Sequence, residues 1–218
     1  MGPEIERYEW ARGVEAMLRF GPRVGPIVVA LPALFEEANR TRALLTAVLR
    51  GLAARGIGGV LPELPGQNDS LVATEDARLS DWRAAFATAT ASLDAPAHVV
   101  AIRAGALIDL DADLVSRWYL SPLSGAAQVR ELERLRQTGG GGDYAGNMID
   151  PAMLAELDAA EPAILPPLRV ARCSGDPRPA DAIFTAPPPW RTSEPRVDPA
   201  LVAAMIDDIA GCVASCGG

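Results

Sequence analysis

The residues with the clearest chemical meaning lie at 101–105, Ala-Ile-Arg-Ala-Gly, where an apolar stretch gives way to small residues. Their spacing is that of a nucleophile elbow, in which small residues flank a serine so that a strained strand-to-helix turn lifts its hydroxyl above the sheet. Ala101 and Gly105 supply the small flanks, but Arg103 stands where the nucleophile should be. A guanidinium stays protonated at neutral pH and cannot attack a carbonyl. The motif therefore predicts an elbow without its usual chemistry.

The only histidine of the chain does not supply a general base. In hydrolases with this elbow, the catalytic histidine follows both the nucleophile and the acid along the chain, and no histidine follows His98. His98 also begins the strand that leads to the elbow, at the end away from Arg103. We therefore predict a structural role for His98.

Four serines near predicted strand ends remain as hydroxyl nucleophiles: Ser70, Ser121, Ser124 and Ser174. None has a visible base, and a carboxylate such as Glu37 acting on water is the alternative. Hydroxyls in such positions usually cap helices or close turns.

The overall composition favours one α/β domain over 1–218. The chain has 218 residues, of which 49% are hydrophobic and only 5% aromatic, and this suits a core of helices and buried strands. All its positive side chains are arginines, and the formal net charge is −8. Since no basic run is dense enough to neutralise phosphates, we expect no nucleic-acid partner.

The cysteines and the apolar segments bear on location and cofactors. Cys173, Cys212 and Cys216 form no even, closely spaced framework, which is typical of a reduced cytoplasmic compartment. With one histidine they make no metal site, so we expect neither a metal nor another cofactor. No leader peptide is evident, and no stretch reaches the 18–20 apolar residues or so of a membrane helix. The sequence predicts a cytoplasmic protein without membrane insertion and leaves its oligomeric state open.

Strands and helices alternate through the first half of the chain. Apolar runs predict strands over 26–32, 57–61 and 98–102, and longer periodic segments predict helices over 43–55 and 81–93. Residues 104–108 suit the start of another tightly packed helix. This alternation predicts a mainly parallel sheet of about six to eight strands, flanked by helices.

The second half is less regular. Strands are predicted over 116–122 and 168–174 and helices over 126–138, 151–160 and 199–213, with Asp150 capping the second helix. Glycines 139–142 read as a hinge, and the stretch from 175 to 195 as proline-rich and irregular. The helices within 124–161 predict a small helical cap inserted over the sheet.

The order of several motifs resembles the exosortase A system-associated hydrolase 2 family of the α/β-hydrolase superfamily. The likeness covers about residues 21–210 and is carried by segments 32–42, 63–70, 102–106, 121–125, 132–136, 145–147 and 189–194, together with Pro151. It implies an α/β-hydrolase-like fold and a link to exopolysaccharide or exosortase genes. Arginine at the elbow is itself a feature that the resemblance implies.

The resemblance also implies where a ligand would bind. Ligands of open α/β sheets lie beyond the carboxyl ends of the strands, where Arg103 would begin a helix whose N-terminus favours anions. The loop after strand 26–32 corresponds to the region that supplies an oxyanion donor, Asp176 is near the usual acid, and 190–194 is near the usual histidine. The candidate pocket residues are Arg103, Glu36, Glu37, Asn39, Arg42, Asp176, Trp190 and Glu194.

Three interpretations remain open at this stage. The chain could be a protein that binds a small anionic or acyl ligand without chemistry, or a non-classical hydrolase or acyltransferase acting on an ester or thioester. In a third, purely structural interpretation, Arg103 is buried and paired with Glu36 or Glu37, since an unpaired buried guanidinium would cost several kcal/mol. This pairing is compatible with either function.

Overall fold

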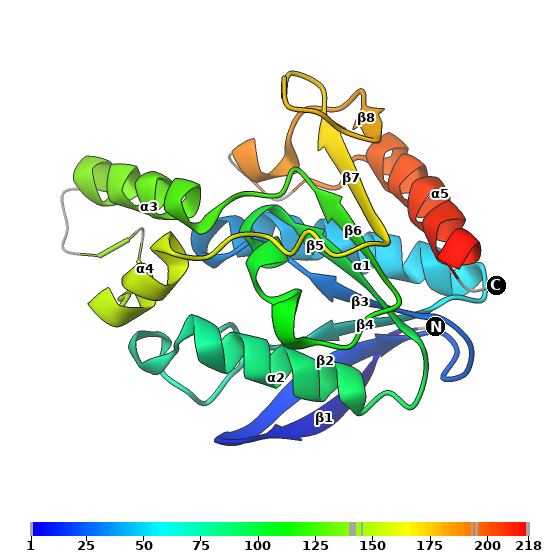
Figure 1. Ribbon diagram of the computed structural model, residues 1–218, viewed down its shortest axis with the longest axis horizontal. Helices are drawn as coiled ribbons and strands as arrows, with labels where there is room; N and C mark the ends of the chain where they lie inside the picture. Colours follow the sequence, from blue (N-terminus) through cyan, green and yellow to red (C-terminus); the bar gives the residue numbers. More distant parts are fainter. Residues whose placement is uncertain (1, 140–142, 145, 193, 195, 217–218) are drawn as a thin grey trace.

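Eight strands form one sheet in the computed structural model, which describes residues 2–139, 143–144, 146–192, 194 and 196–216 (Figure 1). The order across the sheet is β1-β2-β4-β3-β5-β6-β7-β8, and every pair from β4 to β8 is parallel. The strands are β1 (Glu4–Trp10), β2 (Gly13–Phe20), β3 (Ile27–Leu31), β4 (Gly58–Pro62), β5 (Ala97–Ile102), β6 (Ser116–Leu120), β7 (Leu168–Cys173) and β8 (Ala182–Phe184). The predicted mainly parallel sheet is confirmed.

The two N-terminal strands were not predicted. β1 and β2 pair antiparallel with each other, and β2 pairs antiparallel with β4. Tyr8 and Trp10 of β1 are buried while Glu9 between them is exposed, and this alternation is the mark of a strand with one buried face. The short edge strand β8 was also missed, because it lies within the proline-rich stretch that reads as irregular.

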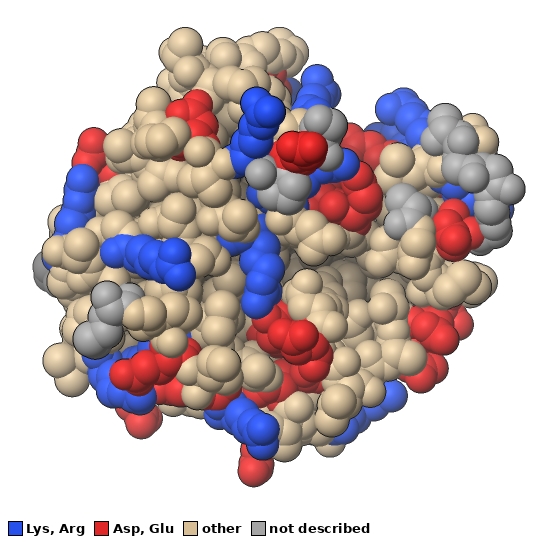
Figure 2. Space-filling model, turned by 180° about the vertical axis from the view of Figure 1, so that it is seen from behind, with Lys and Arg blue, Asp and Glu red and all other residues tan. Residues whose placement is uncertain are grey.

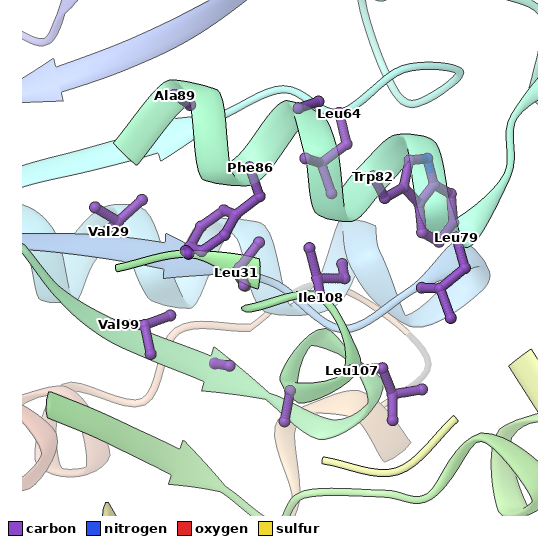
Figure 3. Close-up of a cluster of buried hydrophobic side chains, with 14 of the residues drawn as sticks. Val29, Leu31, Leu64, Leu79, Trp82, Phe86, Ala89, Val99, Leu107 and Ile108 are labelled. Atoms are coloured by element: carbon purple, nitrogen blue, oxygen red, sulfur yellow. The ribbon is translucent and has the colours of Figure 1, made fainter. Parts of the chain in front are cut away.

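Helices cover both faces of the sheet. They are α1 (Ala38–Ala54), α2 (Leu79–Ala91), α3 (Gly125–Gly139), α4 (Pro151–Asp158) and α5 (Pro199–Cys216). α1 and α5 pack on one face, where Leu45 and Leu49 share a buried cluster with Met205 and Ile209. α2 packs on the other face, where Trp82 and Phe86 meet side chains of β3 and β5 (Figure 3). Two hydrophobic clusters, one on each face of the sheet, therefore hold the strands whose ends carry the site.

Helix α5 qualifies the expectation about apolar stretches. Its 18 residues have a mean hydropathy of 1.5, which meets the length and composition of a membrane span. In the fold, however, Leu201, Met205 and Ile209 are buried against the sheet. Asp208 also accepts hydrogen bonds from Trp118 of β6 and Arg169 of β7, so polar contacts join this helix to the sheet as well.

The segment after β3 differs from its prediction. A 3-10 turn, η1 (Phe35–Glu37), leads directly into α1, which begins at Ala38 rather than at 43. The buried Thr41 hydroxyl accepts from the Ala33 N–H (3.0 Å) and donates to the Glu37 carbonyl (3.1 Å). These bonds close the loop over the helix start, a tertiary effect that the polar composition of the segment did not reveal.

Helices α3 and α4 lie between β6 and β7 in the chain and pack against each other at one end of the sheet (Figure 1). Asp150 is the N-cap residue of α4, as predicted, since its carboxylate accepts a hydrogen bond from the Ala152 N–H. Gly125 packs so closely on α4 that an added Cβ would lie 1.6 Å from the Leu157 carbonyl oxygen. That 124–161 acts as a cap stays a prediction, and residues 140–142 of the predicted hinge lie outside the described residues.

Candidate functional site

Arg103 has the backbone geometry of an elbow residue. It follows β5 with a φ of +56°, a left-handed conformation that is uncommon for a side chain of its size and marks local strain. Two residues later, a Cβ on Gly105 would lie 2.4 Å from the Pro32 carbonyl oxygen, so only glycine fits there. The small residue at Gly105 thus allows the turn to pack closely against the loop after β3.

The helix expected after the elbow is absent as such. Residues Arg103–Leu107 form a five-residue 3-10 helix, η3, followed by the three-residue turn η4 (Asp109–Asp111). A single short 3-10 turn does not align enough peptide dipoles to act as an α-helix N-terminus. The predicted anion-favouring dipole at Arg103 is therefore wrong.

The Arg103 guanidinium is held by two carboxylates. Its Nε and Nη2 donate to the two oxygens of Glu37, at 3.2 and 3.3 Å, and Nη2 also donates to Glu131 at 2.6 Å. Only 6% of Arg103 is exposed. Glu37 comes from η1 and Glu131 from α3, so this ion pair network joins the elbow to the helices over the sheet end.

An aromatic ring completes the surroundings of Arg103. Trp190, in the 3-10 turn η5 (Pro189–Arg191), lies with its ring centroid 5.1 Å from the guanidinium carbon, a cation–π distance. Arg40 of α1 fixes that turn, because its Nη1 donates to the Trp190 carbonyl at 3.0 Å. Trp190 therefore occupies space above the elbow that a catalytic side chain could otherwise use.

The ionisation of the pair follows from burial and mutual attraction. Burial acts to lower the pKa of Arg103, but Glu37 and Glu131 outweigh it, so the pKa lies above its ordinary value and the guanidinium stays charged. Burial raises the pKa of Glu37, although Arg103 acts in the opposite direction. The centre is thus an arginine permanently charged and already neutralised by its own neighbours.

A cavity of about 350 Å³ opens beside this network. Apolar side chains line part of it, among them Leu34, Leu132 and Leu135. The face in Figure 2 shows a hollow flanked by both acidic and basic side chains. The charged residues that line the cavity are Glu36, Glu37, Glu131, Arg103, Arg134 and Arg191, three of each sign. We call this amphipathic space the first cavity.

A second cavity of about 220 Å³ lies on the other side of Arg103. The two cavities share Arg103, Trp190 and Arg191, which therefore form the wall between them. Asp176 lines the second cavity only, and its carboxylate accepts from Arg172 at 2.9 Å and Arg178 at 2.7 Å. Hydrogen bonds from Arg178 and Arg172 hold the pKa of Asp176 far below its usual value.

The structure brings four of the predicted residues together: Arg103, Glu36, Glu37 and Trp190 line the first cavity. The others lie elsewhere. Asn39 lines a separate space with Asn68 and Trp82, and Arg42 pairs with the buried Glu63. Both sit in α1, whose early start turns them away from Arg103. Glu194 is exposed and lines neither cavity; its role in ligand binding stays a prediction.

Sequence reasoning missed two residues of the site on α3. Glu131 binds Arg103, and Gln128 is buried beside it with no hydrogen-bond partner for its Oε1 among the described residues. Residues 128, 131, 132 and 135 all line the first cavity. Their i, i+3, i+4, i+7 spacing is that of one helix face, and this periodicity was the signal that could have found them.

His98 lies at the opposite end of β5 from Arg103. It is buried, and its Nδ1 is 2.8 Å from the Ser116 hydroxyl. Burial lowers its pKa, so it is held neutral in the sheet. Within the described part of the chain, no three His, Cys, Asp or Glu side chains gather as a metal-binding group would.

Comparison with solved structures identifies the fold. A protein from Agrobacterium vitis S4 assigned as a hydrolase superposes with a TM-score of 0.63 at 15% identity, covering 97% of this chain and 98% of that one. Mouse alpha/beta hydrolase domain-containing protein 10 gives 0.63 at 12% identity, with 97% and 99% covered. A thermophilic esterase from Thermogutta terrifontis gives 0.51 at 12% identity, with 78% and 80% covered.

The chain therefore has the α/β-hydrolase fold. No family model and no curated protein matches its sequence. At identities of 12–15%, the superpositions establish the architecture and leave the chemistry to the site.

Proposed function

We propose that this chain is an α/β-hydrolase-fold protein that binds a small acyl ligand in the first cavity and does not use a Ser-His-Asp triad. The observation that carries this proposal is the state of Arg103. It stands at the nucleophile position, and its guanidinium already binds Glu37 and Glu131. An arginine so neutralised ties the elbow together and has little remaining charge with which to hold an anion.

The lining of the first cavity supports an acyl ligand. Leucine side chains and the Trp190 ring offer apolar contact, while the charges around them balance. Gln128 Oε1 is buried and has no hydrogen-bond partner in the part of the chain that the structure describes, and a ligand N–H or O–H would satisfy it. A short acyl chain attached through an amide or hydroxyl-bearing group combines both features.

A second function has one observation in its favour. Glu37 is buried next to the first cavity, and burial raises its pKa above the ordinary value, which is the direction that suits a carboxylate general base or acid. The alternative is thus a non-classical hydrolase or acyltransferase, in which Glu37 activates water or an alcohol against an ester or thioester.

The pathway belongs to the same proposal and rests on the sequence resemblance alone. We place the ligand among acyl compounds of exopolysaccharide or exosortase-linked metabolism. Deletion of the gene should then alter exopolysaccharide export in the host, and an unchanged polysaccharide profile would remove this part.

One small thioester tests binding and turnover together. We expect octanoyl-N-acetylcysteamine, which carries an acyl chain and an amide N–H, to bind in calorimetry without release of free thiol. The variant Gln128→Leu should weaken binding by about fivefold, the effect of one buried hydrogen bond. Steady thiol release that is lost in Glu37→Gln would establish the alternative, and absence of binding would refute both.

A fluorophosphonate probe tests the missing triad separately. The wild-type protein should remain unlabelled, because the one histidine, His98, contacts the Ser116 hydroxyl, which is buried at the end of the sheet away from the elbow. Stoichiometric labelling of any serine would contradict the proposal and identify the nucleophile.

A further inference from the structure

The second cavity is lined by Ser121, whose buried hydroxyl has no hydrogen-bond partner among the described residues. Ser121 follows β6 with a φ of +48°, so it is strained in the same sense as Arg103. It is 1% exposed, lines the second cavity, and its Oγ has no hydrogen-bond partner among the described residues. Leaving a buried hydroxyl unpaired is costly, and this cost points to a ligand that would pair it.

The charge around Ser121 is positive. Arg178, Arg191 and Arg103 line the second cavity, and Asp176 is the one carboxylate among its described lining residues. Arg103 is already neutralised by Glu37 and Glu131, so the positive charge comes from the other two arginines. Asp176 pairs with both Arg172 and Arg178, so these three residues together carry one net positive charge. The Cys173 thiol adds no negative charge, because burial raises its pKa to about 11.

Two of these arginines differ in how they are held. Arg178 is fixed in place, donating from Nη2 to Asp176 at 2.7 Å and from Nη1 to the Pro122 carbonyl at 3.3 Å. Arg191 is exposed at the cavity wall, and within the described chain its guanidinium forms no ion pair or hydrogen bond. One ordered cation and one available cation thus flank the unpaired hydroxyl.

We propose that the second cavity is a binding site for a phosphate group, as free phosphate or a phosphate monoester. The Ser121 hydroxyl donates to one oxygen, and Arg178 and Arg191 bind the others. A tetrahedral dianion can accept from three separate donors and matches the positive lining. Arg191 lines both cavities, but Ser121 and Arg178 line the second cavity and not the first, so this site does not depend on the acyl ligand.

Ser121 serves here as a binding group. All the oxygens of the nearby carboxylate are engaged, since Asp176 Oδ1 accepts from the Arg178 Nε and Oδ2 from Arg172 and Arg178. A carboxylate held this strongly ionised is a weak base, so it would not activate the hydroxyl.

Calorimetric titration with inorganic phosphate at constant ionic strength tests the site. We expect saturable 1:1 binding to wild type and at least tenfold weaker binding of acetate. Arg191→Gln should weaken phosphate binding by about tenfold and Ser121→Ala by about fivefold. Arg7→Gln is the matched control, because Arg7 is an exposed arginine on β1, at the opposite edge of the sheet, and it should bind phosphate as wild type does.

The same variants guard against misfolding. Without phosphate, Ser121→Ala should be at least as stable as wild type, because it removes an unpaired buried hydroxyl; with phosphate it should gain less stability than wild type. Equal weakening by Arg7→Gln and Arg191→Gln would reduce the effect to net charge and overturn the proposal. No measurable binding, or unchanged affinity in Ser121→Ala, would overturn it as well.

Discussion

Arg103 and Arg117 are both buried arginines, one directly after β5 and the other on the neighbouring strand β6, yet their surroundings differ. Arg117, in β6, pairs with Asp109 at 2.9 Å, and Tyr119 donates to the same carboxylate at 2.7 Å. Asp109, in η4, is fully buried, and both of its partners come from the single strand β6. Arg103 lies just beyond a strand, on strained backbone, and its partners come from η1, α3 and η5.

The difference shows which signs of function to trust. A buried ion pair alone is compatible with a purely structural role, and the pair of Arg117 lines none of the five cavities described for this chain. Arg103 combines its ion pairs with a positive φ and with open space on two sides. Strain and space beside a charge, more than the charge itself, mark the candidate site.

The largest expected effect is at the core pair. Asp109→Ala should lower the free energy of unfolding by about 5 kcal/mol, because it leaves the Arg117 guanidinium buried without a counter-charge. Urea denaturation measures this loss. Tyr119→Phe, which removes a single hydrogen bond to Asp109, is the milder control and should cost only about 1 kcal/mol. A small loss in Asp109→Ala would erase the contrast between the two arginines.

Arg103→Ala should lower the free energy of unfolding by less, about 3 kcal/mol, although it leaves two carboxylates without their counter-charge. The reason is exposure: the Glu131 side chain is 36% exposed and can turn to water, whereas Glu37 at 14% cannot. The double variant Arg103→Ala/Glu37→Ala should recover part of the loss in the same denaturation assay. If the double variant is less stable than Arg103→Ala, Glu37 is not the stranded partner.

Asp176→Asn should lower stability by about 2 kcal/mol at neutral pH, since the charged acceptor of Arg172 and Arg178 is removed. The folded pKa of Asp176 lies below its unfolded value, so its stabilisation is complete above about pH 4 and is lost as the pH falls through the folded pKa. The deficit of the variant should therefore shrink on acidification. Asp113→Asn, at an exposed aspartate, should show no such deficit at any pH.

The smallest effect has the opposite sign. Gln128→Leu should raise the free energy of unfolding by about 1 kcal/mol, because a buried unpaired oxygen is replaced by an apolar side chain. Thermal denaturation without ligand measures the gain, and it should accompany weaker binding of the acyl probe. A loss of stability instead would mean that Gln128 has a structural partner, and that its role is structural like that of the Arg117–Asp109 pair.

Much of the site's framework was predictable because the signals are local. The apolar runs before 32 and 102 predicted strands β3 and β5, and loops that follow adjacent parallel strands meet at one edge. A pairing of Arg103 with Glu36 or Glu37 was predicted on that ground, and in the structure the partner is Glu37. Asn39 and Arg42 also follow β3, but they do not line the first cavity. Both lie within α1, where Asn39 lines a separate space and Arg42 pairs with Glu63.

What the sequence by itself determined was the alternation of strands and helices and the arginine that directly follows the strand ending at Ile102, because periodicity and residue type are properties of short segments. The tertiary structure decided the rest. Glu37 and Glu131 lie 66 and 28 residues from Arg103, and Ser121 and Arg191 share a cavity with it only after β5, β6 and η5 are packed together. Contacts over such separations depend on the register of whole elements against one another, and no short stretch of sequence encodes that register.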